Sequence, residues 1–290
     1  MAAEVRSCAG PVDLPAISDF LYELYQPGNR DGNWLQPIWE YAYTHPWFDE
    51  ESVSRIGIWE DDGTMVAVAL YELRLGEAFF QIHPDYVHLK PEMLTYAEQH
   101  LTALTEEGKR YLKAYVNDFD RPFEDVVRSR GYERQPRSDR PMAQFVIPEP
   151  FPPIHLPGGF RLKSVAEEND LAKIDRVLWR GFNHPGEPPA DSIEGRKKMQ
   201  SGPHFRQDLT MVVEAPNGAF VAFAGLWFDP VADLPAGRQR WCGKRLHHRQ
   251  FVRPGGPAGS GCDGSSRRKG RPRRRRCSRS RSFRAGASAA

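Results

Sequence analysis

The sequence predicts an α/β (α+β) protein with a mixed central sheet flanked by helices, in one complete copy followed by part of a second. Three observations support this class. Strand-type and helix-type spacings of apolar residues alternate over residues 4–230. The same order of elements begins again about 155 residues later, as the positions of Gly63 and Gly218 show. Beyond Pro230 the chain loses most of its apolar residues and becomes strongly basic.

The first copy can be followed from its first strand to its last. Its first helix carries apolar residues at helical spacing after Asp13, which is a suitable N-cap residue. Asp61-Asp62-Gly63 is typical of a hairpin turn between two β-rich runs. Gly131 is suited to end the last helix. The expected strands are residues 4–7, 54–60, 65–73, 77–82, 110–116 and 142–147, and the expected helices are residues 14–24, 91–107 and 123–130.

The second copy repeats the beginning of the first. Asp13-Leu14-x-x-Ile17 recurs as Asp170-Leu171-x-x-Ile174, and the hairpin around Gly63 recurs around Gly218. The predicted helix places Leu171, Ile174, Leu178 and Phe182 on one face, with Asn169 or Asp170 as its N-cap. The expected strands are residues 160–164, 209–214 and 220–228. The predicted boundaries are a first domain over 1–147, a Pro-rich linker over 148–159, a half domain over 160–230 and a tail over 231–290.

The tail differs in charge from the rest of the chain. It holds 17 of the 40 Lys and Arg residues but only two acidic residues, Asp233 and Asp263, so its net charge is +15. The first 230 residues then carry 23 basic and 36 acidic groups, a net charge of −13. We expect the tail to be disordered, because it has too few apolar residues to offset the entropy lost on folding. Its composition favours translation out of frame after residue 230, and the alternative is a genuine basic tail that binds nucleic acid non-specifically through residues 271–276.

The remaining composition favours a cytoplasmic protein. Only Cys8 lies in the first 230 residues, which argues against a disulfide framework. No apolar run approaches the ~20 residues of a membrane span, and residues 1–11 do not resemble a signal peptide. His83 and His88 have no evident third ligand nearby, so we expect no metal site.

The order of elements resembles the GCN5-related N-acetyltransferase (GNAT) family. Glu60-Asp-Asp-Gly63 is similar to the turn between the second and third strands of that family. His83-Pro84-Asp85-Tyr86 is similar to the entry to its cofactor loop, and Arg128-Ser-Arg-Gly131-Tyr132 to the end of its last helix. Two copies in tandem are similar to the mycothiol synthase type of arrangement.

The resemblance implies acetyl-CoA as co-substrate and an amine of a small molecule or a protein as acceptor. In the family, backbone N–H groups of a Gly-rich turn bind the CoA diphosphate at a helix N-terminus. The corresponding residues 83–92 contain no glycine, and Pro91 lacks an N–H donor. His83, Tyr86 and His88 are therefore the only cofactor-binding candidates in a degenerate loop.

Candidates for the acceptor site lie in the region after the first helix of each copy. Trp34 and His45 belong to an aromatic-rich stretch, and His184 occupies the equivalent place in the second copy. The alternative for these aromatic residues is ordinary core packing. The predicted function is an acetyltransferase impaired by truncation of its second copy. The alternatives are a non-catalytic binding or scaffold protein, and a nucleic-acid binder that acts through the tail.

Overall fold

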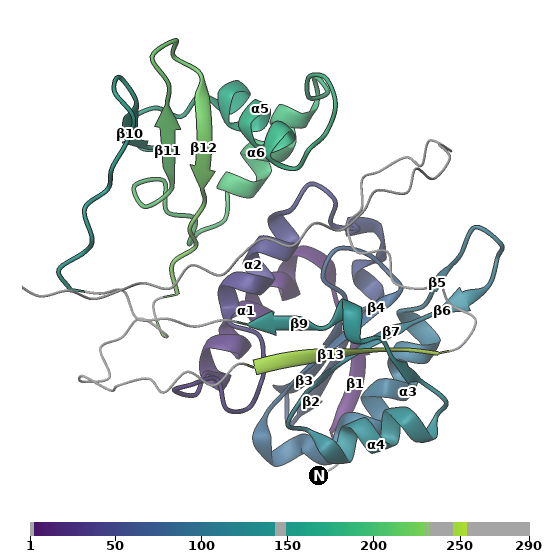
Figure 1. Cartoon of the computed structure of the whole chain (residues 1–290). Helices are drawn as coiled ribbons and strands as arrows, with labels where there is room; N and C mark the ends of the chain where they lie inside the picture. Colours follow the sequence, from purple (N-terminus) through teal and green to yellow (C-terminus); the bar gives the residue numbers. More distant parts are fainter. Residues whose placement is uncertain (1–2, 143–148, 230, 232–245, 254–290) are drawn as a thin grey trace, which may run out of the picture.

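The computed structural model contains a large and a small unit, each with its own sheet (Figure 1), and describes residues 3–142, 149–229, 231 and 246–253. The strands of the large unit are β1 (Glu4–Ser7), β2 (Gly57–Asp61), β3 (Thr64–Leu70), β4 (Glu77–Ile82), β5 (Ala103–Leu104), β6 (Arg110–Tyr111), β7 (Lys113–Asn117), β8 (Glu133–Arg134), β9 (Arg140–Met142) and β13 (Leu246–Val252). Its helices are α1 (Asp13–Leu24), α2 (Gln36–Thr44), α3 (Lys90–His100) and α4 (Arg121–Ser129), with short 3-10 helices η1 (Gly10–Val12), η2 (Glu50–Arg55), η3 (Pro84–Leu89) and η4 (Pro136–Ser138). The small unit contains β10 (Arg161–Ser164), α5 (Leu171–Gly181), α6 (Ser192–Gln200), β11 (Met211–Glu214) and β12 (Phe220–Ala224).

The main sheet of the large unit is mixed, as the sequence predicted. Its strand order is β1-β2-β3-β4-β7-β13-β8, and β9 also pairs with β13. The pairing of β4 with β7 is parallel, and the other pairings in this sheet are antiparallel. Parallel neighbours need a long crossover, and the chain between β4 and β7 supplies it through η3, α3 and the β5–β6 hairpin.

The first hairpin forms where the turn residues predicted it. Asp62 and Gly63 both have positive φ angles, 51° and 73°, as a type I′ turn between antiparallel strands requires. In the small unit, Asp170 accepts a hydrogen bond from the N–H of Lys173 and is the predicted N-cap of α5. In the first copy, Val12 is the N-cap residue of α1, and the Asp13 carboxylate pairs with Arg6 instead.

The two units differ greatly in the size of their hydrophobic cores. The large core includes fully buried side chains from α1, α2, the sheet and α3, among them Ile17, Trp39, Trp59 and Leu94. The small unit buries only Val165, Ile174, Val212 and Phe220 as its core cluster. A three-stranded sheet with so little buried apolar surface has a small intrinsic stability.

Several predicted elements have different bounds. Residues 54 and 55 of the strand expected over 54–60 belong to η2, and the strands expected to end at residues 73 and 228 end at Leu70 and Ala224. The helix expected over 91–107 ends at His100, and Leu104, which was predicted on its apolar face, is an exposed residue of β5. After the helix, the carbonyl of Leu101 accepts from the N–H of Gly76 at 2.7 Å, and the chain then forms the β5–β6 hairpin. The strand expected over 110–116 is divided between β6 and β7, and of residues 142–147 only Met142 is described, at the end of β9.

The predicted end of the helix in the second copy was wrong. Phe182 follows the last residue of α5 and is 71% exposed, so it takes no part in the apolar face that buries Ile174. Helix α6 had no counterpart in the sequence prediction. It corresponds in order to α2 of the first copy, and the two copies therefore share a strand, two helices and a hairpin.

The prediction that the whole tail is disordered was wrong for one segment. Residues Leu246–Val252 form β13, which pairs with β7 on one side and with β8 and β9 on the other. Phe251 is fully buried in the core of the large unit, and the Arg249 guanidinium donates to the Glu124 carboxylate at 2.7 Å. Because β13 fills a position inside the sheet, its backbone pairing and these contacts outweigh its polar composition. Apart from Val231 and Arg253, the rest of the tail lies outside the described residues.

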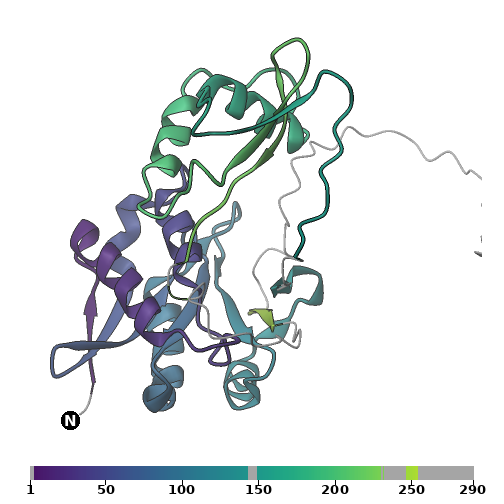
Figure 2. The same ribbon diagram turned by 90° about the vertical axis from the view of Figure 1, so that its left-hand side faces the viewer.

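The small unit lies over the part of the large unit that carries α1 and α2 (Figures 1 and 2). Glu40 of α2 has a fully buried side chain and accepts from the His204 N–H at 2.8 Å, with its other oxygen 2.7 Å from Nδ1 of the same residue. The Tyr22 hydroxyl lies 3.1 Å from Nε2 of His204, and Lys198 of α6 pairs with Glu50. The interface combines these polar contacts with an edge-to-face contact between the rings of Tyr41 and Trp227, whose centroids lie 5.3 Å apart.

We predict that Phe251→Ala lowers the free energy of unfolding of the large unit by about 3–5 kcal/mol, because it removes a fully buried ring. Urea denaturation followed by circular dichroism measures the change. Phe182→Ala is the matched control, since the Phe182 ring is mostly exposed and its loss should cost almost nothing. Equal and small effects of both substitutions would show that β13 contributes no stability to the sheet.

Candidate functional site

The candidate site lies where β4 separates from β7. The two strands pair only at Glu77–Lys113 and Ala78–Ala114, and they have no further pairing toward their carboxyl ends. The groups of Ile82 that face away from β3 therefore have no strand partner, because β3 pairs with β4 on the other side. In open sheets, ligands bind in crevices outside the carboxyl ends of strands.

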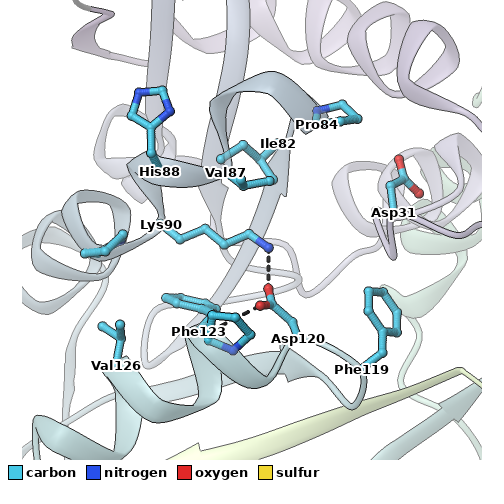
Figure 3. Close-up of a pocket in the computed structure, with 12 residues that line it drawn as sticks. Asp31, Ile82, Pro84, Val87, His88, Lys90, Phe119, Asp120, Phe123 and Val126 are labelled. Atoms are coloured by element: carbon cyan, nitrogen blue, oxygen red, sulfur yellow. Dashed lines mark hydrogen bonds and ion pairs between the residues drawn. The ribbon is translucent and has the colours of Figure 1, made fainter.

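A pocket of about 410 Å³ lies at the open end of this cleft (Figure 3). Its volume is within the usual range of small-molecule pockets. Its lining is mostly apolar and comes from the end of β4, η3, the start of α3 and the segment that leads into α4. The apolar lining residues are Ile82, Pro84, Val87, Pro91, Phe119, Pro122, Phe123 and Val126.

Two charged groups of the pocket, Lys90 and Asp120, are paired with each other. Lys90 extends across the pocket to form an ion pair with Asp120 (Figure 3). Asp120 is also the N-cap of α4 and accepts from the N–H of Phe123 at 3.2 Å. The positive charge of Lys90 is therefore neutralised within the pocket.

Asp31 supplies a second carboxylate to the lining. Burial raises the pKa of the Asp31 carboxyl, while hydrogen bonds from Asn33 act in the opposite direction. An anionic ligand would meet two carboxylates and one paired ammonium group here. The lining thus favours an uncharged ligand segment over a phosphate.

The turn that leads into α3 offers few free donors for an anion. The N–H of Lys90 donates to the carbonyl of Val87, because η3 continues directly into α3. The N–H groups of Asp85 and Tyr86 are bonded to the side chain and the carbonyl of His83, and Pro91 has no N–H. These pairings agree with the sequence interpretation that the turn is poorly suited to a diphosphate.

The cofactor-binding candidates of the sequence are near one another, but they do not converge on the pocket. His88 is exposed and lines the pocket. The Tyr86 hydroxyl donates to Asp61 at 2.6 Å, outside the lining. The rings of His83 and Tyr86 lie 5.8 Å apart, and His83 is not among the lining residues either. Their proposed role in binding acetyl-CoA stays a prediction.

The acceptor-site candidates Trp34, His45 and His184 are not brought together. Trp34 is buried against Phe79, with ring centroids 4.6 Å apart. His45 lies at the interface between the units, and His184 packs on Trp179 of the small unit. Core packing, the alternative that the sequence left open for the aromatic residues, accounts for the position of Trp34. The roles of His45 and His184 in an acceptor site stay predictions.

Sequence reasoning missed the segment that crosses the cleft. The carboxamide of Asn33 accepts from the N–H of Ile82 at 2.8 Å and donates to its carbonyl at 2.9 Å. The amide of Asn117, at the end of β7, donates to the carbonyl of Gly32 at 3.2 Å. Asp31-Gly32-Asn33 has the composition of a turn between two helices, so nothing in the sequence distinguished it from an ordinary loop.

The described part of the chain shows neither a metal site nor a membrane-spanning helix. Within it, no group of three or more His, Cys, Asp or Glu side chains is arranged to hold a metal ion. None of its helices is long and apolar enough to cross a membrane.

The structure is similar to several solved N-acetyltransferases. A GCN5-related N-acetyltransferase from Sphaerobacter thermophilus matches with 15% identity over 86% of this chain and 95% of that chain, at a TM-score of 0.46. A tandem GNAT protein from the clavulanic acid biosynthesis pathway matches with 12% identity over 77% of this chain and 74% of that chain, at a TM-score of 0.42. The PaiA N-acetyltransferase from Thermoplasma acidophilum, in complex with coenzyme A, matches with 13% identity over 46% of this chain and 91% of that chain, at a TM-score of 0.29. No protein-family model and no curated protein matches the sequence.

We predict that His45 makes stability depend on pH. Burial, and then the charges of Arg196 and Lys198, lower the pKa of His45 from 6.5 to about 4. The unfolded chain therefore takes up a proton at this position before the folded chain does, and stability present at neutral pH is lost as the pH falls from about 6.5 to about 4.

His45→Asn should reduce this loss of stability, and urea midpoints at about pH 7 and pH 5 measure it. His88→Asn is the control, because His88 is exposed. If both substitutions leave the same pH dependence as the unaltered chain, the shifted pKa of His45 does not contribute.

Proposed function

We propose that the chain is an acyl-CoA-dependent N-acetyltransferase of the GNAT type, with its donor site in the pocket between β4 and β7 and with impaired activity. The observation that carries the proposal is the early separation of these parallel strands, with a pocket at their open end. An arm of amide and methylene groups fits the mostly apolar lining better than an ion does. His83, Tyr86 and His88 remain candidates for contacts with the nucleotide part of the donor.

The reaction is the transfer of an acetyl group to an amine of a small molecule or a protein. The amine nitrogen attacks the thioester carbonyl, a C–N bond forms and the C–S bond breaks. The proton lost by the nitrogen passes to a base or to water. The CoA thiolate leaves and takes up a proton to become CoA. Positioning of the thioester accounts for much of the rate in such a transfer.

We expect impaired activity because few free donors are available where the diphosphate of the donor would lie. The turn at Asp85, Tyr86 and Lys90 uses its N–H donors internally, and Lys90 is held by Asp120. Without convergent donors, the diphosphate contributes little binding energy, and the thioester is poorly positioned. The second copy ends its described sheet at β12 and offers no parallel strand pair in which a donor could lie.

A second candidate function is non-catalytic binding by the same scaffold. The bonds of Asn33 to Ile82 favour it, because they occupy the cleft edge that a donor arm would use. Incubation with acetyl-CoA and a panel of amines, followed by mass spectrometry, separates the two functions. Acetylated product supports the transferase, and ligand binding without product under the same conditions supports the binding protein.

We predict that pantetheine and CoA bind with affinities within about threefold of each other, both near the millimolar range, about −4 kcal/mol. The reason is that the pocket can hold the amide arm but lacks free donors for the diphosphate. Calorimetric titration of the whole chain with each compound measures the ratio.

Lys90→Ala tests whether the ion pair neutralises Lys90. We expect this substitution to leave the ratio of the CoA and pantetheine affinities almost unchanged, because Lys90 is already paired with Asp120. Its matched control is Lys109→Ala, which changes an exposed lysine outside the pocket. Micromolar binding of CoA with a hundredfold preference over pantetheine would contradict the proposed impairment and reveal an intact diphosphate site.

A further inference from the structure

We propose that residues 31–34 form a strap that closes the cleft between β4 and β7, so that a pantetheine arm enters the cleft only after the strap has left. This regulation of the donor site rests on the function proposed above. The strap links the α1 and α2 side of the large unit to both cleft walls, at Ile82 and at Asn117.

The contact with β4 supplies the hydrogen bonds that a neighbouring strand would otherwise make. Buried backbone N–H and C=O groups need hydrogen-bond partners, and Ile82 has lost contact with β7. The carboxamide of Asn33 supplies one acceptor and one donor to the same residue, at 2.8 Å and 2.9 Å. Both Asn33 and Ile82 are buried, so water does not replace these bonds easily.

The contact with β7 depends on glycine. Gly32 has a φ angle of 72°, and a Cβ atom at this position would overlap the side-chain amide of Asn117. The absence of a side chain lets the Asn117 amide donate to the Gly32 carbonyl at 3.2 Å. The strap is therefore attached to the second wall by close backbone approach.

The strap borders the pocket at Asp31 and contacts side chains of β4 at Trp34. Asp31 lines the pocket together with Ile82 and Phe119. Behind it, the N–H of Trp34 donates to the side chain of Gln81 at 2.7 Å, and the Trp34 ring packs on Phe79. An arm that passes from the pocket along β4 meets the strap first.

A pantetheine arm would compete with Asn33 for the same groups. Extended amide chains bind to a free strand edge through its backbone N–H and C=O groups, and Ile82 can serve only one partner at a time. The apparent affinity for the arm is then reduced by the fraction of molecules in which the strap is open. Release of the strap by another ligand or by the acceptor would restore the affinity.

The first test uses the unaltered chain. Hydrogen exchange followed by mass spectrometry reports on the strap peptide and on β4, with and without saturating pantetheine. We expect pantetheine to speed exchange in the strap peptide by at least tenfold, while β4 remains protected because the arm replaces Asn33. A strap that stays protected while pantetheine is bound would overturn the proposal.

The second test uses substitutions that detach the strap. Asn33→Ala removes both bonds to Ile82, and Gly32→Ala keeps Asn33 but forces the segment away from Asn117. Each should speed exchange at Ile82 and tighten pantetheine binding about tenfold, or about 1.4 kcal/mol. Arg30→Ala is the control, because Arg30 is exposed and next to the strap.

The two proposals can fail separately. If neither variant nor the unaltered chain binds pantetheine or CoA, the proposed function fails, and exchange at Ile82 alone decides whether the strap holds the cleft edge. If exchange at Ile82 is unchanged in a folded Asn33→Ala and a folded Gly32→Ala, the strap proposal is wrong whatever the chain binds. If pantetheine binds the unaltered chain as tightly as both variants, the competition is wrong.

Discussion

The parallel contact between β4 and β7 is the constraint on which the rest of the large unit depends. Two residue pairs hold these strands together, and beyond Ala78 and Ala114 they have no further pairing. A parallel pair requires a long crossover, so η3 and α3 must begin at the carboxyl end of β4. The same geometry creates a pocket at this end and leaves the edge of Ile82 without a strand partner.

Both ends of the pocket show how the free groups of a separated strand pair are satisfied internally. At the outer end, Lys90 and Asp120 neutralise each other, and the turn into α3 pairs its own donors. At the inner end, the Asn33 carboxamide satisfies Ile82. Leaving the buried N–H and C=O groups of Ile82 unpaired would cost about 1–3 kcal/mol each. The chain thus gains stability by pairing these groups with its own side chains.

The sheet also depends on a strand from far along the sequence. β13 pairs with β7 over five residues and separates it from β8. Phe251 belongs to the large core, and the Arg249 side chain bonds to Glu124 of α4. The chain between β9 and β13 includes the small unit, which contacts α1 and α2 through Glu40 and His204. The small unit has a minor core of its own, so these contacts contribute to its position on the large unit.

Local sequence determined the elements in which residues near one another decide the outcome. The turn at Asp62 and Gly63, the extent of β4 and the N-cap Asp170 all follow from turn chemistry, alternation and capping. The tertiary structure alone decided the elements that pair over long distances. The carbonyl of Leu101 after α3 bonds to the N–H of Gly76, β13 enters the sheet despite its polar composition, and Asn33 bonds to Ile82 across 49 positions. The physical reason is that a backbone N–H or C=O group can bond to any partner of suitable geometry. The sequence of a turn or of a polar run does not indicate which distant strand will have backbone groups without a partner.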